Sequence, residues 1–240
     1  MAPQRDVIVM GASAGGVPLL KRVLRQLPAN LDAAVAVAIH RSLSIPSTLA
    51  DVFGNGAHLP VIEPRNGQRF EKGKVYLAPA DVHMSLGQGC IHLERGPRQH
   101  HTRPAIDPLF ESAARAYGPR AVGVILSGML SDGVTGLIEI KHHGGLSLVQ
   151  DPDEAACPSM PLNALAYDDV DLIFEVDVLC SILVELAAGA TPAAAALSTG
   201  GRARQPPIAL APDWVTRAAR SGVLSGQTRR MHGIARQRRA

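Results

Sequence analysis

Residues 7–16 read VIVMGASAGG, and this stretch sets the expectation for the whole fold. The run 7–10 is short and entirely apolar, which is typical of a buried strand. The glycine- and alanine-rich turn after it leads into the segment 17–27, whose apolar residues recur at helical spacing. A strand that passes through a tight turn into a helix is the opening unit of an α/β sheet.

The same alternation of apolar runs and amphipathic segments continues along the chain. Further strands are predicted at 33–39, 121–126, 146–150 and 172–174, and further helices at 47–53, 108–117, 134–143, 160–166 and 178–186. This alternation predicts an α/β fold with a doubly wound, mostly parallel sheet and helices on both faces. Residues 61–95 differ, because short β-prone pieces are separated there by glycine turns. We expect a small antiparallel hairpin region at this place, inserted in the main sheet or attached to it.

The chain divides by charge near residue 190. Its formal charge is +3, but residues 191–240 hold nine arginines and a single acid, Asp213, so they carry +8 and leave −5 for residues 1–190. The Ala/Pro/Gly-rich start of this segment is typical of a linker. We therefore expect one folded domain over 1–190 and a basic tail without fixed structure over 191–240. The alternative is a tail that docks weakly on an acidic partner, nucleic acid or a membrane surface.

Composition excludes several classes of protein. The 240 residues are 46% hydrophobic, which is ample for a buried core. No run approaches the about 20 apolar residues of a transmembrane helix, and the first apolar run is too short for a signal peptide. Cys90, Cys157 and Cys180 are far apart and form no CxxC pair, which predicts free thiols. The sequence thus predicts a soluble cytoplasmic protein without membrane insertion and, given the mild overall charge, without a nucleic-acid partner.

The turn 11–16 permits two functional interpretations. A dinucleotide loop of the form G-x-G-x-x-G needs a second glycine where the chain has Ser13, and strand 33–39 is followed by His40 rather than by an acid. A nucleophile turn of the form G-x-S-x-G fits, because it presents the Ser13 hydroxyl in front of the free N–H groups of a helix. By itself this pattern also fits a plain tight connection or a phosphate cradle.

Two further side chains are expected at the same edge of the sheet as Ser13. His40 ends the strand 33–39, and Asp132 follows the strand 121–126. Each has an ordinary alternative, a histidine without a role and an aspartate that caps the next helix. Together they supply the residue types of a nucleophile, its base and the group that orients the base. The chain order Ser, His, Asp differs from that of α/β-hydrolases, trypsin and subtilisin.

Seven short segments, in this order, resemble one known family. They are GASAGG, AIHRS, YLAPADVHM, TRPAIDPLF, VILSGMLSDGVTGL, HHGGLSLVQD and CPSMPLNAL, and they lie between about residues 7 and 186. Together they resemble the catalytic domain of the chemotaxis protein-glutamate methylesterase family (CheB type). The resemblance implies removal of methyl esters from glutamyl residues on the cytoplasmic helices of methylated chemoreceptors, with methanol release, and deamidation of certain receptor glutamines. It implies no cofactor.

The resemblance also implies roles for individual residues. Ser13 would be the nucleophile, His40 the general base and acid, and Asp132 the residue that orients His40. The backbone N–H of Met129 falls at the family's oxyanion hole, and the N–H of Ala14, next to the nucleophile, is the second expected donor. An ordinary histidine titrates near pH ~6.5, so His40 can accept a proton at neutral pH. Nothing in this chemistry requires a metal.

Other polar residues keep two interpretations. His83 could line the substrate cleft or be purely structural. Arg103 could meet the acidic receptor surface, or it could form an ion pair with Asp107 or another acid. The adjacent pairs His100-His101 and His142-His143 point apart on a regular element, and we expect no metal at either pair.

The chain departs from the family pattern at three places. The first motif begins at residue 11, so we expect no N-terminal receiver domain, no control by phosphorylation in cis, and regulation by a separate protein if there is any. Ala14 stands where many members have threonine. Leu130 stands where a second glycine often follows Met129, and its side chain could narrow the cleft.

Three functions remain open at the level of sequence. A receptor-directed methylesterase is favoured because Ser13, His40 and Asp132 are all present. A non-catalytic signalling adaptor of the same fold would need none of the three. A serine esterase acting on another carboxyl ester would retain them. Covalent labelling of Ser13 by a fluorophosphonate separates the adaptor from the two enzymes.

Overall fold

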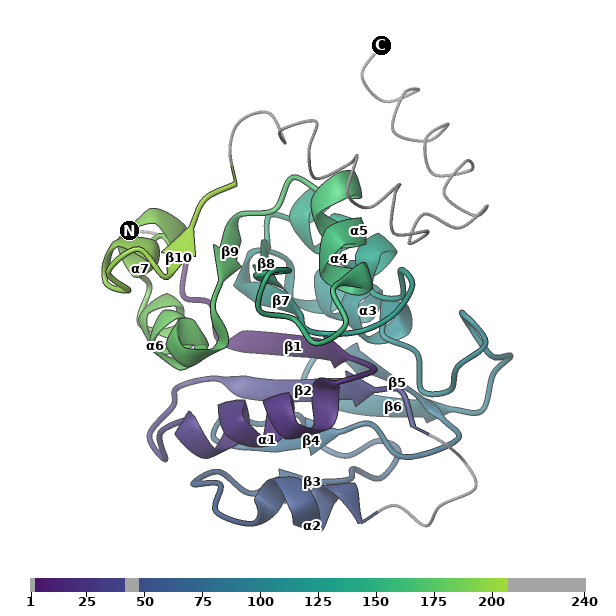
Figure 1. Ribbon diagram of the computed structural model, residues 1–240. Coiled ribbons are helices and arrows are strands. Elements are labelled where there is room, and N and C mark those ends of the chain that lie inside the picture. Colours follow the sequence, from purple (N-terminus) through teal and green to yellow (C-terminus); the bar gives the residue numbers. More distant parts are fainter. Residues whose placement is uncertain (1–2, 42–47, 207–240) are drawn as a thin grey trace.

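An eight-stranded sheet forms the centre of the computed structural model, which describes residues 3–41 and 48–206. The strand order is β10-β9-β8-β7-β1-β2-β4-β3 (Figure 1). The strands are β1 (Val7–Ala12), β2 (Ala34–Ile39), β3 (Val61–Ile62), β4 (Val75–Leu77), β7 (Ala121–Ile125), β8 (Leu146–Gln150), β9 (Leu172–Phe174) and β10 (Ala203–Arg204). All neighbours pair in parallel except β9 and β10.

Helices cover both faces of this sheet (Figure 1). One face carries α1 (Gly16–Gln26), α2 (Leu49–Gly54), α6 (Val176–Ala187) and α7 (Pro192–Leu197), and the other carries α3 (Asp107–Tyr117), α4 (Val134–His142) and α5 (Ser159–Tyr167). Because successive strand residues point to opposite faces, β1 supplies Ile8 and Met10 to one core and Val7 and Val9 to the other. The predicted doubly wound α/β fold is confirmed. In the part of the chain that the structure describes, no helix is long and apolar enough to cross a membrane.

The region 61–95 forms only one of the hairpins expected there. β5 (His83–Gly87) and β6 (Cys90–Glu94) pair antiparallel in a separate two-stranded sheet that packs under α3. β3 and β4 instead join the main sheet, where they pair in parallel with each other, and β4 pairs with β2. The expectation of a hairpin was wrong for this pair. Turns near residues 66–67 and 72–73 reverse the chain twice, so β4 runs in the same direction as β3.

Folded structure continues beyond the boundary expected at residue 190. The Thr191 side chain caps the N-terminus of α7, and Ala195 is buried against the core. β10 adds an antiparallel edge strand to β9, and Arg204 pairs with Asp151 at 2.5 Å. The alanine-rich composition reads as a linker, but alanine also has the highest helix propensity, and tertiary packing decides between the two. The rest of the expected basic tail, from residue 207, lies outside the described residues.

The strand order reverses at β1, so the carboxyl end of β1 is the topological switch point of the sheet. β2 lies on one side of β1 and β7 on the other. In open α/β sheets the connections leave in opposite directions at such a point, and ligands bind in the gap between them. Ser13, His40 and Asp132 follow β1, β2 and β7, so all three lie at this edge.

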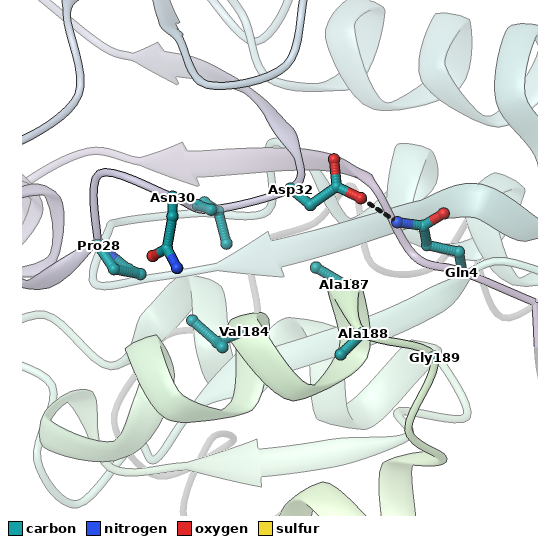
Figure 2. A pocket seen from close by; sticks show the side chains of 9 residues that line it. Gln4, Pro28, Asn30, Asp32, Val184, Ala187, Ala188 and Gly189 are labelled. Carbon is teal, nitrogen blue, oxygen red and sulfur yellow. Dashed lines mark hydrogen bonds between the residues drawn. The ribbon is translucent and has the colours of Figure 1, made fainter.

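A pocket lies at the opposite edge of the sheet from Ser13, His40 and Asp132 (Figure 2). It is lined by residues that precede β1 and β2, among them Gln4 and Asp32, and by Val184, Ala187 and Ala188 of α6 and its end. The Gln4 amide donates a hydrogen bond to Asp32 Oδ2 at 2.5 Å. Ser13, His40 and Asp132 are not among its lining residues, so this pocket takes no part in the chemistry described below.

Candidate active site

Ser13 follows β1 directly, and the loop after β7 holds its backbone. The Ser13 N–H donates to the Ser127 carbonyl at 3.0 Å, and the Gly16 N–H donates to the Ser13 carbonyl at 2.9 Å. Gly15 begins α1 with φ of +78°, and a Cβ there would lie 2.8 Å from Ser127 Oγ. The turn therefore needs glycine both for its left-handed backbone and for this close approach. The result is a fixed, half-exposed serine in front of a helix N-terminus.

His40 follows β2 and bridges Ser13 and Asp132. Its Nδ1 lies 2.9 Å from Ser13 Oγ, and its Nε2 lies 2.5 Å from Asp132 Oδ2. Because an ionised carboxylate only accepts, Nε2 carries the proton, and the lone pair of Nδ1 faces the serine hydroxyl. In trypsin the ring is used in the opposite sense, with Nδ1 toward the aspartate. Either ring nitrogen of a neutral imidazole can carry the proton, so His40 can still donate to the aspartate and accept from the serine.

Asp132 is buried, with 1% of its surface exposed, and it lies against the N-terminus of α3. Its carboxylate accepts the N–H groups of Ile106 at 2.7 Å and of Asp107 at 3.1 Å, in addition to His40. Such N–H groups stabilise a negative charge. Asp132 does not cap the helix that follows it, because the N-cap of α4 is Gly133. The alternative in which Asp132 caps the helix that follows it is therefore wrong, because its carboxylate contacts the N-terminus of α3 instead.

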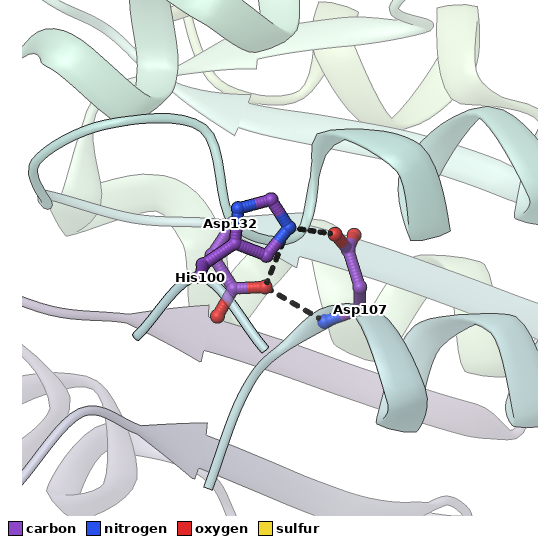
Figure 3. Close-up of side chains that lie close together, drawn as sticks. All are labelled: His100, Asp107 and Asp132. Atoms are coloured by element: carbon purple, nitrogen blue, oxygen red, sulfur yellow. Dashed lines mark hydrogen bonds and ion pairs between the residues drawn. The ribbon is translucent and has the colours of Figure 1, made fainter. Parts of the chain in front are cut away.

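A second histidine and a second buried carboxylate lie behind Asp132 (Figure 3). His100 Nε2 is 2.9 Å from Asp107 Oδ2 and 4.0 Å from Asp132 Oδ1. Asp107 Oδ1 also accepts the N–H of Gly136 at 2.8 Å. Burial raises the pKa of Asp107, and the hydrogen bond to Asp107 raises the pKa of His100. Sequence spacing could not indicate this contact, because it depends on a left-handed turn at His100, where φ is +48°.

The donor atoms of His100, Asp107 and Asp132 lie within 4.8 Å of one another, which is close enough to share a metal ion. Each of these residues already takes part in hydrogen bonds within the protein. The two carboxylates accept N–H groups from Ile106, Asp107 and Gly136, and His100 shares its Nε2 with Asp107. N–H dipoles that point at the same oxygens oppose a cation. Hydrogen bonding accounts for the cluster without an ion.

Two backbone N–H groups beside Ser13 have no acceptor among the described residues. They belong to Ala14, in the turn before α1, and to Met129, in the loop between β7 and α4. This loop passes close to the serine, because a Cβ on Gly128 would lie 3.0 Å from Ser13 Cβ. Free N–H groups next to a nucleophile can receive an oxygen that becomes negatively charged.

The His83 side chain is buried, and only 7% of the residue's surface is exposed. Its Nε2 lies 2.9 Å from the Pro97 carbonyl, and its Nδ1 accepts the N–H of Ala105 at 3.2 Å. Both ring nitrogens thus hold the segment between β6 and α3. Of the two interpretations open for His83, these contacts favour the structural one.

Arg103 forms an ion pair within the protein. Its Nε and Nη2 lie 2.9 and 2.5 Å from Asp81 Oδ1, and its Nη1 donates to the Gly96 carbonyl at 2.6 Å. The contacts again favour the structural interpretation. The acid involved is Asp81, whereas Asp107 is bonded to His100.

Fold and site together define a class of protein, an α/β protein with a hydrogen-bonded Ser–His–Asp series, the residue types of a serine hydrolase, at the carboxyl edge of its sheet. The CheB methylesterase family model matches residues 8–183, so this chain belongs to the CheB methylesterase family. The family resemblance of the sequence motifs is thereby confirmed.

Relatives with curated names cover the same part of the chain. The protein-glutamate methylesterase/protein-glutamine glutaminase 2 of Anaeromyxobacter dehalogenans is 40% identical over 185 residues, which are 77% of this chain and 54% of that protein. The protein-glutamate methylesterase/protein-glutamine glutaminase of Pyrococcus abyssi is 32% identical over 186 residues, which are 76% of this chain and 50% of that protein. The chain spans about half the length of these curated relatives.

The fold also resembles that of solved structures. The crystal structure of the Thermotoga maritima CheB methylesterase catalytic domain superposes with a TM-score of 0.72 at 28% identity. The match covers 77% of this chain and 100% of that one. The architecture described above is therefore that of a CheB catalytic domain.

Proposed function

We propose that this chain is a protein-glutamate methylesterase that also deamidates glutamine, with Ser13 as its nucleophile. The observation that carries the proposal is the hydrogen-bonded series Ser13, His40, Asp132, with distances of 2.9 and 2.5 Å, in a member of this family. Its substrates are glutamyl methyl esters on the cytoplasmic helices of methylated chemoreceptors. A cytoplasmic location and regulation by a separate protein belong to the same proposal.

The first half of the reaction forms an acyl-enzyme. Ser13 Oγ attacks the ester carbonyl carbon while its proton passes to His40 Nδ1. The carbonyl oxygen becomes an oxyanion and accepts the N–H groups of Ala14 and Met129. Asp132 accepts the Nε2–H of the imidazolium and so stabilises its charge. His40 then returns the proton to the leaving oxygen, and methanol departs from a glutamyl ester of Ser13.

The second half uses water in place of the serine. His40 Nδ1 takes a proton from water as its oxygen attacks the glutamyl ester of Ser13. The proton returns to Ser13 Oγ, and a free glutamate side chain leaves. With a glutamine substrate the first proton goes to the amide nitrogen, ammonia departs, and the acyl-enzyme is the same. Neither route includes a metal or another cofactor.

The buried surroundings of Asp132 suit its role as the orienting acid. The two N–H groups of the α3 N-terminus and the His40 ring surround its carboxylate, so the charge has three hydrogen-bond donors. A charge-assisted hydrogen bond of this kind fixes both the tautomer and the plane of the histidine. An adaptor that only bound partners would have no use for this arrangement, whereas an esterase for a different carboxyl ester would.

Two measurements test the proposal. Fluorophosphonate labelling of wild type and Ser13→Ala shows whether Ser13 is activated. Methanol release from methylated receptor membranes shows whether the substrate is the proposed one. Ser131→Ala, in the same loop as Asp132, is the matched control, and we expect it to label and to release methanol as wild type does. Equal methanol release by wild type and Ser13→Ala would refute the proposed activity. Labelling without methanol release would favour another ester.

A further inference from the structure

The loop between β7 and α4 carries two neighbouring apolar side chains that face solvent. In the described part of the chain four large hydrophobic side chains are exposed, and two of them are Met129, 58% exposed, and Leu130, 47% exposed. Single exposed apolar residues are common on proteins and need no explanation. Met129 and Leu130 are adjacent in the loop that passes beside Ser13, and together they form a local apolar surface.

Leu130 adopts a backbone conformation that is unfavourable for leucine. Its φ is +66°, in the left-handed region where a branched side chain crowds the backbone. Helix α5 holds it there, because the Leu130 N–H donates to Ser159 Oγ at 3.1 Å and its carbonyl accepts the Asn163 amide at 2.7 Å. Glycine would fit the same backbone without strain. Because Leu130 is half exposed, burial of its side chain offsets little of this strain, and packing within the folded chain does not account for a leucine at this position.

The position of the loop indicates which contact that is. Gly128 packs against Ser13, the Met129 N–H has no acceptor among the described residues, and Asp132 lies two residues beyond Leu130. A substrate whose carbonyl reaches Ser13 therefore comes close to this loop. A glutamyl methyl ester is uncharged, whereas the product is a carboxylate whose removal from water is costly. An apolar rim therefore suits the ester better than its product.

On the basis of the proposed function, we propose that Leu130 is a specificity-determining residue that packs against an apolar side chain next to the esterified glutamate of the substrate. The strained backbone projects the leucine from the loop, and α5 keeps it there through Ser159 and Asn163. Leu130 takes no part in proton transfer. It contributes to the choice of which methylated glutamate is hydrolysed.

Two synthetic peptides test this proposal. Both carry one glutamyl methyl ester, flanked on each side by leucine in one peptide and by serine in the other. The variant Leu130→Asn keeps a residue that tolerates a left-handed backbone but removes the apolar contact. We expect it to lower kcat/KM for the leucine peptide by about tenfold, and to change kcat/KM for the serine peptide by less than about threefold.

A second readout separates substrate contact from a change in the loop itself. The rate of fluorophosphonate labelling does not depend on the flanking residues, and we expect it to stay within about twofold of wild type. Leu130→Gly, which relaxes the backbone, should behave as Leu130→Asn does. Leu197→Asn is the matched control, because Leu197 is 83% exposed on α7, and it should change neither peptide.

The outcomes are distinct. Equal loss for both peptides, or a parallel fall in labelling, would overturn the role of Leu130 while the proposed function stands. Unchanged hydrolysis of the leucine peptide by Leu130→Asn would overturn it as well. If wild type labels normally but releases methanol neither from the peptides nor from methylated receptor membranes, the proposed function itself is wrong, and the assignment of Leu130 falls with it.

Discussion

Replacing Asp132 by asparagine removes one charge without a change of size, and the structure specifies what must follow. Asp132 Oδ2 accepts both His40 Nε2–H at 2.5 Å and the Ile106 N–H at 2.7 Å, while Oδ1 accepts the Asp107 N–H at 3.1 Å. An asparagine has one oxygen and one NH2 group for these two positions. With its oxygen at Oδ1, the NH2 group opposes the Ile106 N–H and donates to His40, which favours the tautomer with its proton on Nδ1. With its oxygen at Oδ2, the NH2 group opposes the Asp107 N–H.

Both orientations carry a cost that can be assigned a magnitude. The wrong tautomer removes the lone pair that receives the Ser13 proton, and loss of the orienting charge in trypsin-type enzymes lowers turnover by about 10⁴-fold. We expect Asp132→Asn to lower the rate of Ser13 labelling by about 10³- to 10⁴-fold at pH 7. One buried N–H also loses its acceptor in either orientation, which costs about 1–3 kcal/mol of the free energy of unfolding.

Asp107→Asn is the control that separates these two effects. Asp107 is also buried and also accepts a backbone N–H, that of Gly136, but its carboxylate does not touch His40. Urea unfolding should show a loss of stability for both variants. Labelling by a fluorophosphonate should fall by less than about tenfold for Asp107→Asn, because His40 keeps its acceptor. Labelling of Asp132→Asn at nearly the wild-type rate, or equal losses in the two variants, would refute the assignment of Asp132 as the orienting acid.

Three further predictions concern stability. Burial raises the pKa of Asp168 to about 6, and Asp168 Oδ2 has no hydrogen-bond partner. Between about pH 4 and pH 6 the folded state therefore holds a proton that the unfolded state has lost, and stability falls as pH rises through this range. Asp168→Asn should raise the free energy of unfolding by about 3 kcal/mol at pH 8 and change it little at pH 4. An equal effect of Asp168→Asn on urea unfolding at both pH values would contradict this. The raised pKa of His100 gives the same direction of pH dependence, but it reflects a favourable contact: the bond to Asp107 stabilises the fold below the ordinary histidine pKa, and this stabilisation is lost as pH rises through the folded pKa. His100→Gln should thus destabilise more at pH 6 than at pH 9 in urea unfolding, and its exposed neighbour in the control His101→Gln should show no such pH dependence. Truncation after residue 190 removes α7 and β10 and should lower Tm, while truncation after residue 206 retains every described element and should leave Tm unchanged; the same Tm for both would show that α7 and β10 add nothing to the fold.

Residue patterns along the chain are enough to predict most of the strands and helices and the edge of the sheet at which the candidate site forms. Apolar runs such as 7–10 have the length and composition of buried strands, and each is followed by an amphipathic segment of helical length. In a parallel sheet all strands end at the same edge. Residues that follow different strands, such as Ser13, His40 and Asp132, can therefore be placed together without knowledge of their contacts. The turn at Gly15 is also local, since its left-handed backbone requires glycine whatever surrounds it.

The contacts that these residues make depend on tertiary packing and cannot be predicted from local sequence patterns. The donors to Asp132 come from the N-terminus of α3, the partner of Arg103 is Asp81, and His100 meets Asp107 through a left-handed turn. The parallel pairing of β3 with β4, and the packing of α7 and β10 on the core, likewise have no local signal. Periodicity reports how one segment divides its own side chains between core and solvent. Contacts between segments depend on how helices and strands distant in the chain pack against one another. This packing also holds Leu130 against α5 in a backbone conformation that leucine disfavours.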